Sequence, residues 1–479
     1  MNHAVIRRIL GLILLFESAF LLLPCMVAVI YREKQGLSYL AVAFICLVIG
    51  FLLTRKKTEN QMFYAKEGFV IVALIWIVMS FFGAMPYYLS GDIPDVSQAL
   101  FEAVSGFTTT GASTLSSVEV LSHCTLVWRA FTIWIGGMGV IVFLLAVLPL
   151  TGGYNMHLMR AESPGPSVGK LVPKVRETAK ILYLIYISLT VIEIVLYILA
   201  GMPVFDAVTT GFSTAGTGGF GIRNDSMGSY STVLQILITI FMILFGVNFN
   251  FYYFLLGKEK KEAFKMEEVR WYFTIIVVAA LLIAVDIRGM FDNIGIALQQ
   301  AFFQVGSIIT TTGFSTIDFN LWPQGSKTIL VLLTFLGACA GSTGGGIKVS
   351  RLLILIKTLK KELFTIVHPR GVKKITMDKR PIEHETVRLT NIFMVAYIFI
   401  LAFSILLIGI DNLDFTTNFT AVAATLNNIG PGLELVGPTH NFGLFSDFSK
   451  FILMFDMLAG RLEIFPMLML FAPISWKRQ

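Results

Sequence analysis

The sequence predicts an all-α polytopic membrane protein in which four repeats surround a central pore, with a two-helix hairpin before them. The first observation is composition: 56% of the 479 residues are hydrophobic and only 14% are charged, and the mean hydropathy is +0.77. A soluble globular protein does not need so much apolar composition. The second observation is a Thr/Gly motif that recurs between apolar segments. Each repeat is therefore expected to contain a helix, a pore half-helix, a filter loop and a second helix.

The N-terminal hairpin is predicted from two apolar segments, residues 9–31 and 37–53. Each is close to the roughly 20 residues that cross a bilayer. The first segment follows Arg7 and Arg8 and could be mistaken for a secretion signal. It is long, lacks a clear small-residue cleavage site and is followed at once by the next segment, so we expect a retained helix. Residues 1–60 are assigned to this hairpin.

The first pore repeat, residues 61–165, sets the pattern for the others. Residues 69–89 are long enough to span a membrane, and residues 126–150 form a return span. Between them, the apolar residues 99–107 are too short to cross and lead into the first Thr/Gly loop. A re-entrant half-helix is the structure expected for such a segment.

The same order predicts three further repeats, at residues 166–262, 263–375 and 376–479. Their first spans are expected at residues 181–200, 271–284 and 389–410. Their half-helices are expected at residues 204–214, 294–309 and 415–426. Their return segments are expected at residues 233–256, from 328 onward, and at 448–471. Parallel repeats around an axis along the membrane normal can close a pore.

Charged residues divide the connecting segments into two sets. Loops between repeats are rich in Lys and Arg, whereas turns beside the Thr/Gly loops are acidic, with Arg223 and Arg288 as exceptions. By the positive-inside rule, both termini are expected in the cytoplasm and the half-helices enter from outside. The acids would either raise the cation concentration at the entrance or only solvate the turns. They are Asp92, Asp95, Asp225, Asp318, Asp411, Asp414 and Glu434.

The four Thr/Gly loops are the candidate selectivity filter. Backbone carbonyls in such loops can replace the hydration shell of an ion, and glycine allows conformations closed to other residues. In the second loop Gly216 competes with Gly219, which is favoured because Gly219-Phe220 matches Gly313-Phe314. The filter residues are expected to be Thr108, Thr109, Thr110, Gly111, Gly216, Thr217, Gly218, Gly219, Thr310, Thr311, Thr312, Gly313, Asn427, Asn428, Ile429 and Gly430.

A run of glycines interrupts the apolar segment 328–356. Each glycine disfavours a regular helix by about 1 kcal/mol relative to alanine. Unwound backbone at membrane depth survives only where it lines a cavity or is buried in protein. We therefore expect residues 337–346 to form a flexible gate beneath the filter, and a small-residue packing face is the alternative.

Arg461 is a charge inside the last apolar segment, and such a charge marks a functional position. It either pairs with Glu463 or Asp456, or projects into the pore as an electrostatic barrier below the filter. Residues two apart on a helix do not face each other, which disfavours the pair with Glu463. Lys348 is expected to anchor the cytoplasmic side or to contact a regulator.

The repeats, the motif Thr310-Thr311-Thr312-Gly313-Phe314-Ser315 and the glycine-rich residues 337–348 resemble the Trk/Ktr/HKT superfamily of potassium transporters. The likeness covers essentially the whole chain, and the loop at residues 427–432 is the most diverged. It implies a channel-like potassium-uptake subunit in the lipid of the bacterial cytoplasmic (inner) membrane. It also implies a homodimer gated by a cytosolic, TrkA-like ring of nucleotide-binding RCK domains.

The resemblance also implies roles for individual residues. Potassium is the transported ion, and no organic cofactor is expected on this chain. Potassium would contact Thr109, Thr110, Gly218, Gly219, Thr311, Thr312, Asn428 and Ile429. The gating residues would be Gly337, Gly341, Ser342, Thr343, Gly344, Gly345, Gly346, Lys348 and Arg461.

Other functional classes are disfavoured by the residues themselves. Residues 216–221 fit GxGxxG without a strand before them, and residues 341–348 resemble a phosphate-binding loop with Ile347 misplaced before the lysine. No catalytic or metal-ligand spacing of His or Cys is present, so neither an enzyme nor a metal site is expected. The net charge of +7 is interpreted as topology rather than nucleic-acid binding. A cation symporter, coupling potassium to sodium or protons, remains the alternative. Its coupling carboxylate would be one of Glu193, Asp286, Asp456 and Glu463.

Overall fold

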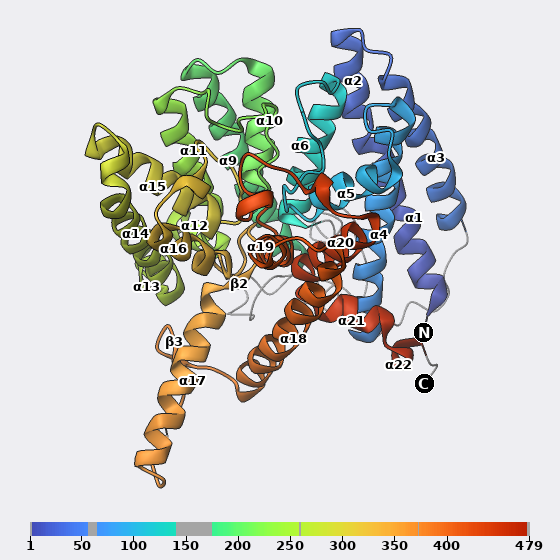
Figure 1. Cartoon of the computed structure of the whole chain (residues 1–479). Coiled ribbons are helices and arrows are strands. Elements are labelled where there is room, and N and C mark those ends of the chain that lie inside the picture. Colours follow the sequence, from blue (N-terminus) through green and yellow to red (C-terminus); the bar gives the residue numbers. More distant parts are fainter. Residues whose placement is uncertain (1, 56–64, 140–174, 258–259, 372, 477–479) are drawn as a thin grey trace.

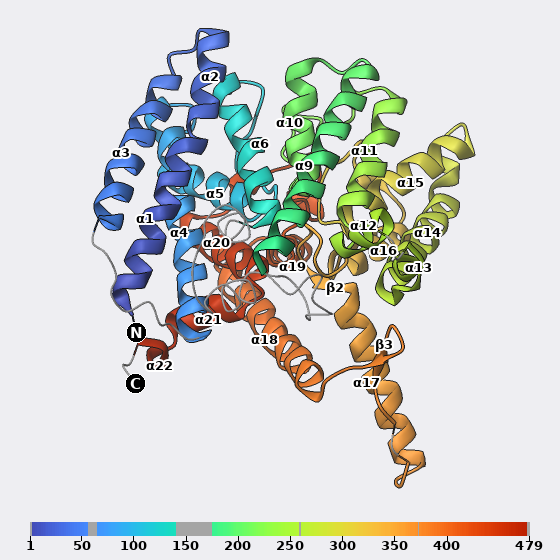
Figure 2. The ribbon, with the colours of Figure 1, turned by 180° about the vertical axis from the view of Figure 1, so that it is seen from behind.

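The computed structural model describes residues 2–55, 65–139, 175–257, 260–371 and 373–476, which are mainly helical (Figure 1). Among these residues, six helices are long and apolar enough to cross a membrane, and a bent pair makes a seventh candidate. Figure 2 shows the same bundle from behind, with both termini at the end from which helix α17 (Val349–Val367) projects. The predicted class, an all-α polytopic membrane protein, is confirmed.

The N-terminal hairpin has the predicted two spans. Helices α1 (His3–Phe20) and α2 (Leu22–Tyr31) follow each other along one span, and α3 (Gly36–Thr54) returns beside them. Gly11 on α1 and Gly50 on α3 meet back to back, since a Cβ on Gly50 would lie 2.8 Å from the carbonyl oxygen of Gly11. Small residues at this crossing let the two backbones approach closely.

The order of long helix, half-helix, loop and return helix recurs four times in the described residues. The long helices are α4 (Ala65–Ser90), α9 (Val175–Leu199), α14 (Glu267–Ile287) and α18 (His384–Ile408). The half-helices are α5 (Val96–Phe107), α10 (Val204–Ala215), α15 (Ile294–Ile309) and α19 (Phe415–Leu426). The return helices begin with α6 (His123–Met138), α11 (Thr232–Phe245), α16 (Gln324–Thr334) and α20 (Asp447–Arg461). The residue limits given above for each repeat stay predictions.

Three of the four half-helices, all except α10, start at a residue whose side chain caps them, and all four stop at the Thr/Gly loops. Asp95 accepts a hydrogen bond from the amide of Gln98, and Asp414 accepts one from the amide of Thr417, each at 2.9 Å. At the other end, each half-helix terminates directly before its loop. The C-terminal end of a helix carries a partial negative charge. Four such ends therefore point at the loops, where they favour a cation.

Two return segments are broken, contrary to the expectation of continuous spans. Helices α11 and α12 (Phe249–Leu256) meet at 91°, and Asn248 caps α12. Helices α20 and α21 (Phe465–Phe471) are separated at Glu463 and Ile464, whose φ angles are 56° and 71°. Polar residues mark both breaks, Asn248 at the first and Arg461 with Glu463 at the second, but average hydropathy over each segment stays high enough to predict one span. The first return helix ends at Met138, and residues 140–150 of its predicted span lie outside the described part of the chain.

The predicted interruption of the third return segment is confirmed. After α16, the strand β1 (Leu336–Gly337) pairs in parallel with β2 (Ile347–Lys348), and α17 begins at once. The glycine-rich segment is thus a loop closed at its base by paired strands. A second pair, β3 (Thr376–Met377) with β4 (Arg380–Pro381), forms a small antiparallel hairpin between α17 and α18. The short helices α13 (Lys260–Lys265) and α22 (Pro473–Trp476) complete the described elements.

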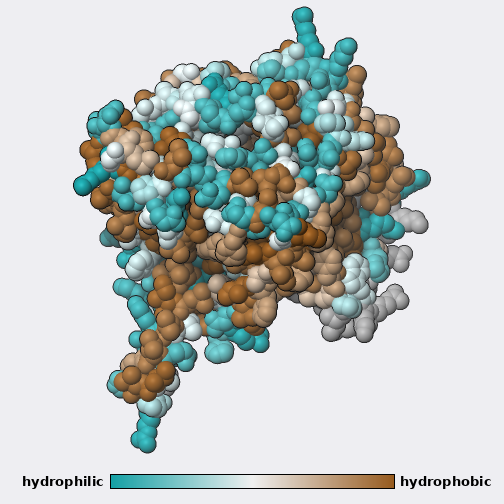
Figure 3. All heavy atoms as spheres, viewed as in Figure 1, coloured by the Kyte–Doolittle hydropathy of each residue, from teal (hydrophilic) through white to brown (hydrophobic). Residues whose placement is uncertain are grey.

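The distribution of polarity is that of a protein in lipid. Large apolar side chains are exposed on the outer helices, such as Phe44 at 65% and Phe399 at 72%. In Figure 3 apolar side chains cover the flanks of the body and continue onto α17. The threonines of the Thr/Gly loops are instead fully buried. Polar groups collected in the interior of an apolar bundle mark a pathway rather than a packing core.

Candidate ion pathway

The four Thr/Gly loops share one backbone conformation. Positive φ angles of 54–59° occur at Thr109, Thr217, Thr311 and Asn428, and each is followed two residues later by a glycine with positive φ. A threonine in this region is uncommon and strained by about 1–3 kcal/mol, so the same geometry in four loops is imposed by the fold. The glycines are Gly111, Gly219, Gly313 and Gly430.

The amide groups of these loops are turned toward the half-helices. In the first loop the amides of Thr108, Thr109 and Thr110 donate to carbonyls of α5 at 2.8–3.0 Å. Equivalent bonds occur in the other three loops, always to residues four, three and five positions earlier. Alternating negative and positive φ angles place successive amides on one side, which leaves the carbonyls on the other. No backbone amide of the described residues donates to those carbonyls, although the Gly216 carbonyl accepts from the Thr217 hydroxyl at 2.7 Å.

The loops meet in a closed ring. A Cβ added to Gly111 would overlap the carbonyl oxygen of Gly218 in the next loop. The same holds for Gly219 against Thr312 and for Gly313 against Ile429, and a Cβ on Gly430 would lie 2.9 Å from the Thr110 oxygen. Each glycine therefore faces the residue that precedes the next glycine, and the fourth loop returns to the first. A side chain would close this passage.

The second loop agrees with the choice of Gly219 over Gly216. Gly216 has φ of −79°, and its added Cβ would meet Ile133 of α6 rather than a neighbouring loop. Gly219 instead has φ of +62° and occupies the position of Gly313 in the ring. The match of Gly219-Phe220 with Gly313-Phe314 is thus also a match in geometry.

An ion pair behind the first loop was missed in the sequence. Glu102 of α5 accepts hydrogen bonds from Arg129 Nε at 3.1 Å and Nη2 at 2.9 Å, and both residues are buried. The other Glu102 oxygen accepts from the Ser113 hydroxyl at 2.7 Å and the Thr114 amide at 2.8 Å. The Arg129 guanidinium lies 4.0 Å from the ring centroid of Phe220, which follows the second loop. The sequence offers one signal for this pair, because Glu102 and Arg129 are opposite charges within apolar segments.

The glycine-rich loop touches the filter loops of the third and fourth repeats. The Gly345 amide donates to Thr311 Oγ1 at 2.7 Å. A Cβ on Gly344 would lie 3.0 Å from the Thr310 oxygen, and one on Gly345 would lie 2.6 Å from the Asn427 oxygen. The segment therefore lies between the ring and the projecting helix α17. This is the level predicted for a gate.

Gly341 and Thr343 of the glycine-rich loop bind the second repeat, and Ser342 binds within the loop. The Gly341 carbonyl accepts from the Phe249 amide at 3.1 Å, and Thr343 Oγ1 donates to the Phe245 carbonyl at 3.3 Å. Ser342 Oγ donates to the carbonyl of Cys339 at 2.7 Å. The loop is thus held by side chains and by the break between α11 and α12.

Of the two roles expected for Lys348, contact with a soluble regulator conflicts with its position, because the residue is only 1% exposed. Its side chain is buried and Nζ donates to the carbonyls of Gly344 and, at 2.9 Å, Gly345. One ammonium group thereby supplies a hydrogen-bond donor to two carbonyls of the loop. Lys348 holds the glycine-rich loop from within.

Arg461 reaches across the centre of the bundle. From α20 of the fourth repeat, its guanidinium donates to the Thr343 carbonyl at 2.7 Å and to the Gly136 and Gly137 carbonyls at 2.5 and 2.8 Å. These acceptors belong to the third and first repeats, which flank the fourth in the ring. The carboxylate of Glu463 binds Arg351, and Asp456 accepts from Ser404 at 2.7 Å. The alternative in which Arg461 pairs with Glu463 or Asp456 is therefore wrong, and the role of Arg461 as a barrier stays a prediction.

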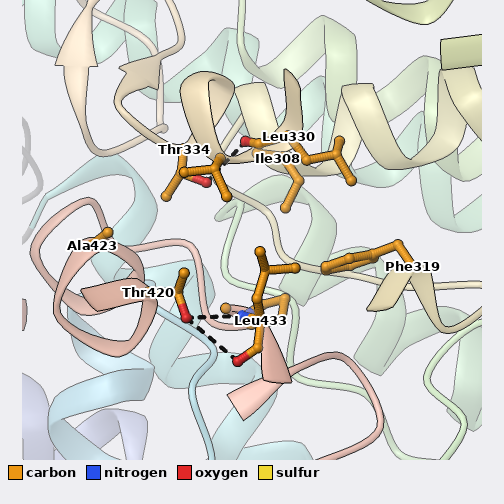
Figure 4. A pocket seen from close by; sticks show the side chains of 10 residues that line it. Ile308, Phe319, Leu330, Thr334, Thr420, Ala423 and Leu433 are labelled. Atoms are coloured by element: carbon orange, nitrogen blue, oxygen red, sulfur yellow. Dashed lines mark hydrogen bonds between the residues drawn. The ribbon is translucent and has the colours of Figure 1, made fainter. Parts of the chain in front are cut away.

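The small cavity in Figure 4 is separate from this pathway. It has a volume of about 20 Å³ and lies among α15, α16 and α19, with apolar lining from Ile308, Phe319 and Leu330. Thr420 beside it binds both the amide of Leu433 at 3.0 Å and its carbonyl at 3.4 Å. Such a space holds about one water molecule and is a packing gap.

Two of the acids in the turns are helix caps. The hydrogen bond from the Gln98 amide, with one from the Ser97 hydroxyl, holds the pKa of Asp95 below its ordinary value. Hydrogen bonds from the hydroxyl and amide of Thr417 lower the pKa of Asp414 in the same way. Both carboxylates are therefore charged at neutral pH. Capping accounts for their contacts, and attraction of cations stays a prediction.

Long apolar helices around a ring of buried polar loops are typical of a membrane transport protein. The chain belongs to the TrkH family of cation transport proteins, whose family model matches residues 38–478. This confirms the superfamily that the motifs indicate and agrees with the expectation of a transporter rather than an enzyme.

Relatives and a solved structure match over the full length. The Trk system potassium uptake protein TrkH of Salmonella typhimurium is 39% identical and that of Escherichia coli is 38% identical, with 100% of each chain covered. The crystal structure of the potassium transporter TrkH from Vibrio parahaemolyticus has a TM-score of 0.89 and 34% identity, over 100% of both chains. The fold described above is therefore the fold of that transporter.

Proposed function

We propose that the chain takes up potassium across the bacterial inner membrane through a channel-like pore whose filter is the ring of four Thr/Gly loops. The observation that carries this proposal is the alternation of φ angles in all four loops together with the contact of each glycine with the next loop. Carbonyls freed on one side of a closed ring can replace the water around a cation. The names of the full-length relatives support potassium as that cation.

Potassium would meet the carbonyls of the residues that alternate in φ. We assign the contacts to two consecutive residues of each loop. They are Thr109, Thr110, Gly218, Gly219, Thr311, Thr312, Asn428 and Ile429. The C-terminal ends of the half-helices add negative potential at the same place. Uptake is then driven by the membrane potential and needs no chemical step.

Gating would occur at the constriction formed by the glycine-rich loop and Arg461. Arg461 and the loop share a hydrogen bond through the Thr343 carbonyl, so movement of one changes the position of the other. We further propose that both termini lie in the cytoplasm, that the protein is a homodimer, and that a cytosolic ring of RCK domains acts on α17. Because β2 continues directly into α17, a partner that moves α17 would also move the glycine-rich loop.

The decisive experiment replaces Gly313 with serine in protein reconstituted into vesicles. A side chain at Gly313 would overlap the Ile429 carbonyl, so Gly313→Ser should lower potassium flux at least about tenfold or abolish the preference for potassium over sodium. The matched control is Gly409→Ser, where an added Cβ meets no atom within 4 Å and φ is −57°. Unchanged permeability of Gly313→Ser would remove this loop from the filter.

The alternative function is a symporter that couples potassium to sodium or protons. Of its candidate carboxylates, Glu193 is buried and accepts from Tyr197 at 2.6 Å, and Asp286 accepts from the Ser326 hydroxyl at 2.6 Å. Both lie on long outer helices and are bound to neighbouring side chains rather than to the ring. The reversal potential decides: it follows potassium alone for a channel and shifts with the coupled ion for a symporter.

A further inference from the structure

A second cavity lies far from the filter, where α17, the β3–β4 hairpin and the start of α18 come together (Figure 1). Its volume is about 490 Å³, within the range of about 300–1,000 Å³ typical of small-molecule sites. None of the filter or gating residues lines it. Ion conduction therefore does not explain why the cavity is there.

The cavity carries an excess of positive charge. Lys361, Lys373, Lys374 and Arg388 line it together with a single carboxylate, Glu362. Glu362 lies 3.5 Å from Lys361, and Arg388 binds Glu385 at 2.7 Å. Four cations against two carboxylates leave an excess of two charges before His384 is considered. Within the described residues, the ammonium group of Lys374 has no ion pair or hydrogen bond.

The cavity is also lined by apolar side chains and by the first residue of α18. Ile375, Ile382 and Val387 supply a half-buried apolar surface beside the basic groups. His384 is the first residue of α18, a helix of 25 residues, and lies in the lining as well. Free amides and the positive end of a helix favour phosphate and similar anions. The cavity therefore has basic side chains on one part of its lining and apolar side chains on another.

The cavity lies at the level where a membrane span begins. Helix α18 is the start of the apolar span His384–Asp411, and on its second and third turns Leu389 and Ile392 are exposed by 45% and 44%. These side chains face lipid when the span is in a bilayer. The lining residues Val387 and Arg388 are therefore at the depth of phospholipid headgroups.

We propose that this cavity binds one anionic phospholipid, with the phosphate among Lys361, Lys374 and Arg388 and the glycerol region against Ile382 and Val387. The proposal rests on the orientation given under the proposed function, which places the site in the cytoplasmic leaflet. Anionic lipids are concentrated there, and basic pockets between helices recognise their headgroups. The apolar half favours a lipid over free phosphate.

Native mass spectrometry of the full-length, delipidated protein tests this directly. The protein is titrated with dioleoyl phosphatidylglycerol and, in parallel, with dioleoyl phosphatidylcholine. The pocket variant carries Lys361→Gln, Lys374→Gln and Arg388→Gln. The control variant removes the same number and kind of charges outside the lining, with Lys360→Gln, Lys379→Gln and Arg380→Gln. We expect the pocket variant to bind the first phosphatidylglycerol at least about tenfold more weakly, and the control variant to stay within about twofold of the wild type.

Four outcomes would overturn the proposal. Equal losses in the two variants would mean a general surface charge effect. Equal retention of phosphatidylcholine and phosphatidylglycerol would exclude recognition of the anionic headgroup. Displacement of the lipid by millimolar inorganic phosphate would indicate a free-phosphate site. A change of oligomeric state in the pocket variant, with lipid binding intact, would assign the cavity to a contact between copies. Lipid binding is measured without ion gradients, so a failure of potassium transport would not be confused with a failure here.

Discussion

Glu102 and Arg129 are single residues on which the shape of the first filter loop depends. Glu102 binds both the loop exit, at Ser113 and Thr114, and the return helix, at Arg129. Arg129 extends this contact to Phe220 of the second repeat. One carboxylate thus connects two neighbouring loops, although it lies behind the ring of glycine contacts.

Replacing Glu102 by glutamine should destabilise the protein and reduce its preference for potassium over sodium. Loss of one member of a buried ion pair leaves the other charge uncompensated and typically costs about 3–5 kcal/mol. We expect a lower unfolding temperature in detergent and a reduced preference for potassium over sodium. The control is Arg223→Gln, because its pair with Asp206 is 37% exposed on the arginine side and exposed pairs contribute about 0–1 kcal/mol. If both variants unfold at the same temperature, Glu102 has no such structural role.

Arg461 offers a test that separates charge from hydrogen bonding. Its positive charge near the centre of the ring repels a passing cation, and low local dielectric strengthens that repulsion. Arg461→Ala should therefore raise basal potassium flux severalfold in vesicles, whereas Arg461→Lys keeps the charge and should leave flux low. Equal increases in both variants would show that the bonds to Thr343, Gly136 and Gly137, rather than the charge, restrict the pore.

At the level of single residues, the sequence predicts the positions of the Thr/Gly loops better than the side chains that support them. Thr110-Gly111 and Thr312-Gly313 are visible as a repeated motif, and Gly219 could be chosen by its following phenylalanine. The fourth loop has Asn428 where others have threonine, yet its φ of 55° is equivalent, and asparagine tolerates this region well. Glu102 and Arg129 are each recognisable as a charge in an apolar segment, but their contact could not be predicted, because 27 residues separate them.

At the scale of elements, hydropathy predicts where segments lie but not where they bend. Half-helices were found because their apolar length is too short to cross, which is a direct physical limit. The 91° bend between α11 and α12 was missed because it depends on tertiary contacts, such as the Phe249 amide bound to Gly341. The glycine-rich loop was predicted because glycine itself disfavours a helix.

The glycine-rich loop should open when its internal support is removed. Lys348→Met deletes the ammonium group that binds the Gly344 and Gly345 carbonyls, and shortening residues 337–346 should act in the same direction. Both changes are expected to raise basal flux without the regulator. Combined with Arg461→Ala, Lys348→Met should give less than the product of the single effects, since both act on one constriction. A fully multiplicative double variant would place the two residues at independent barriers.

At the scale of the whole molecule, one chain supplies the membrane body and one projecting arm. Helix α17 projects from the same end of the body as the termini, on the opposite side from them (Figures 1 and 2), and it begins where the glycine-rich loop ends. Its exposed basic side chains include Lys360, and the hairpin next to it adds Lys379 and Arg380. This arrangement suits an acidic surface on a soluble partner.

Neutralising that arm should weaken binding of the cytosolic ring. The variant Lys360→Gln with Arg370→Gln, Lys379→Gln and Arg380→Gln is expected to co-purify with several-fold less of the RCK-type partner, because long-range charge attraction is lost. The lipid-pocket variant serves as the control and should retain the partner. If both variants keep it equally, the basic arm acts only on lipid and topology.

The closed ring of glycine contacts has a consequence for how such a protein changes over generations. In a filter assembled from identical subunits, a single altered codon appears four times around the axis. Here the four loops occur in one chain and are encoded by separate codons, so one altered codon changes only one quarter of the ring. The divergent loop at residues 427–430 shows that one quarter can differ in its side chains while it keeps the shared backbone. Ion preference can therefore be adjusted in small steps, which a fourfold repeated subunit does not allow.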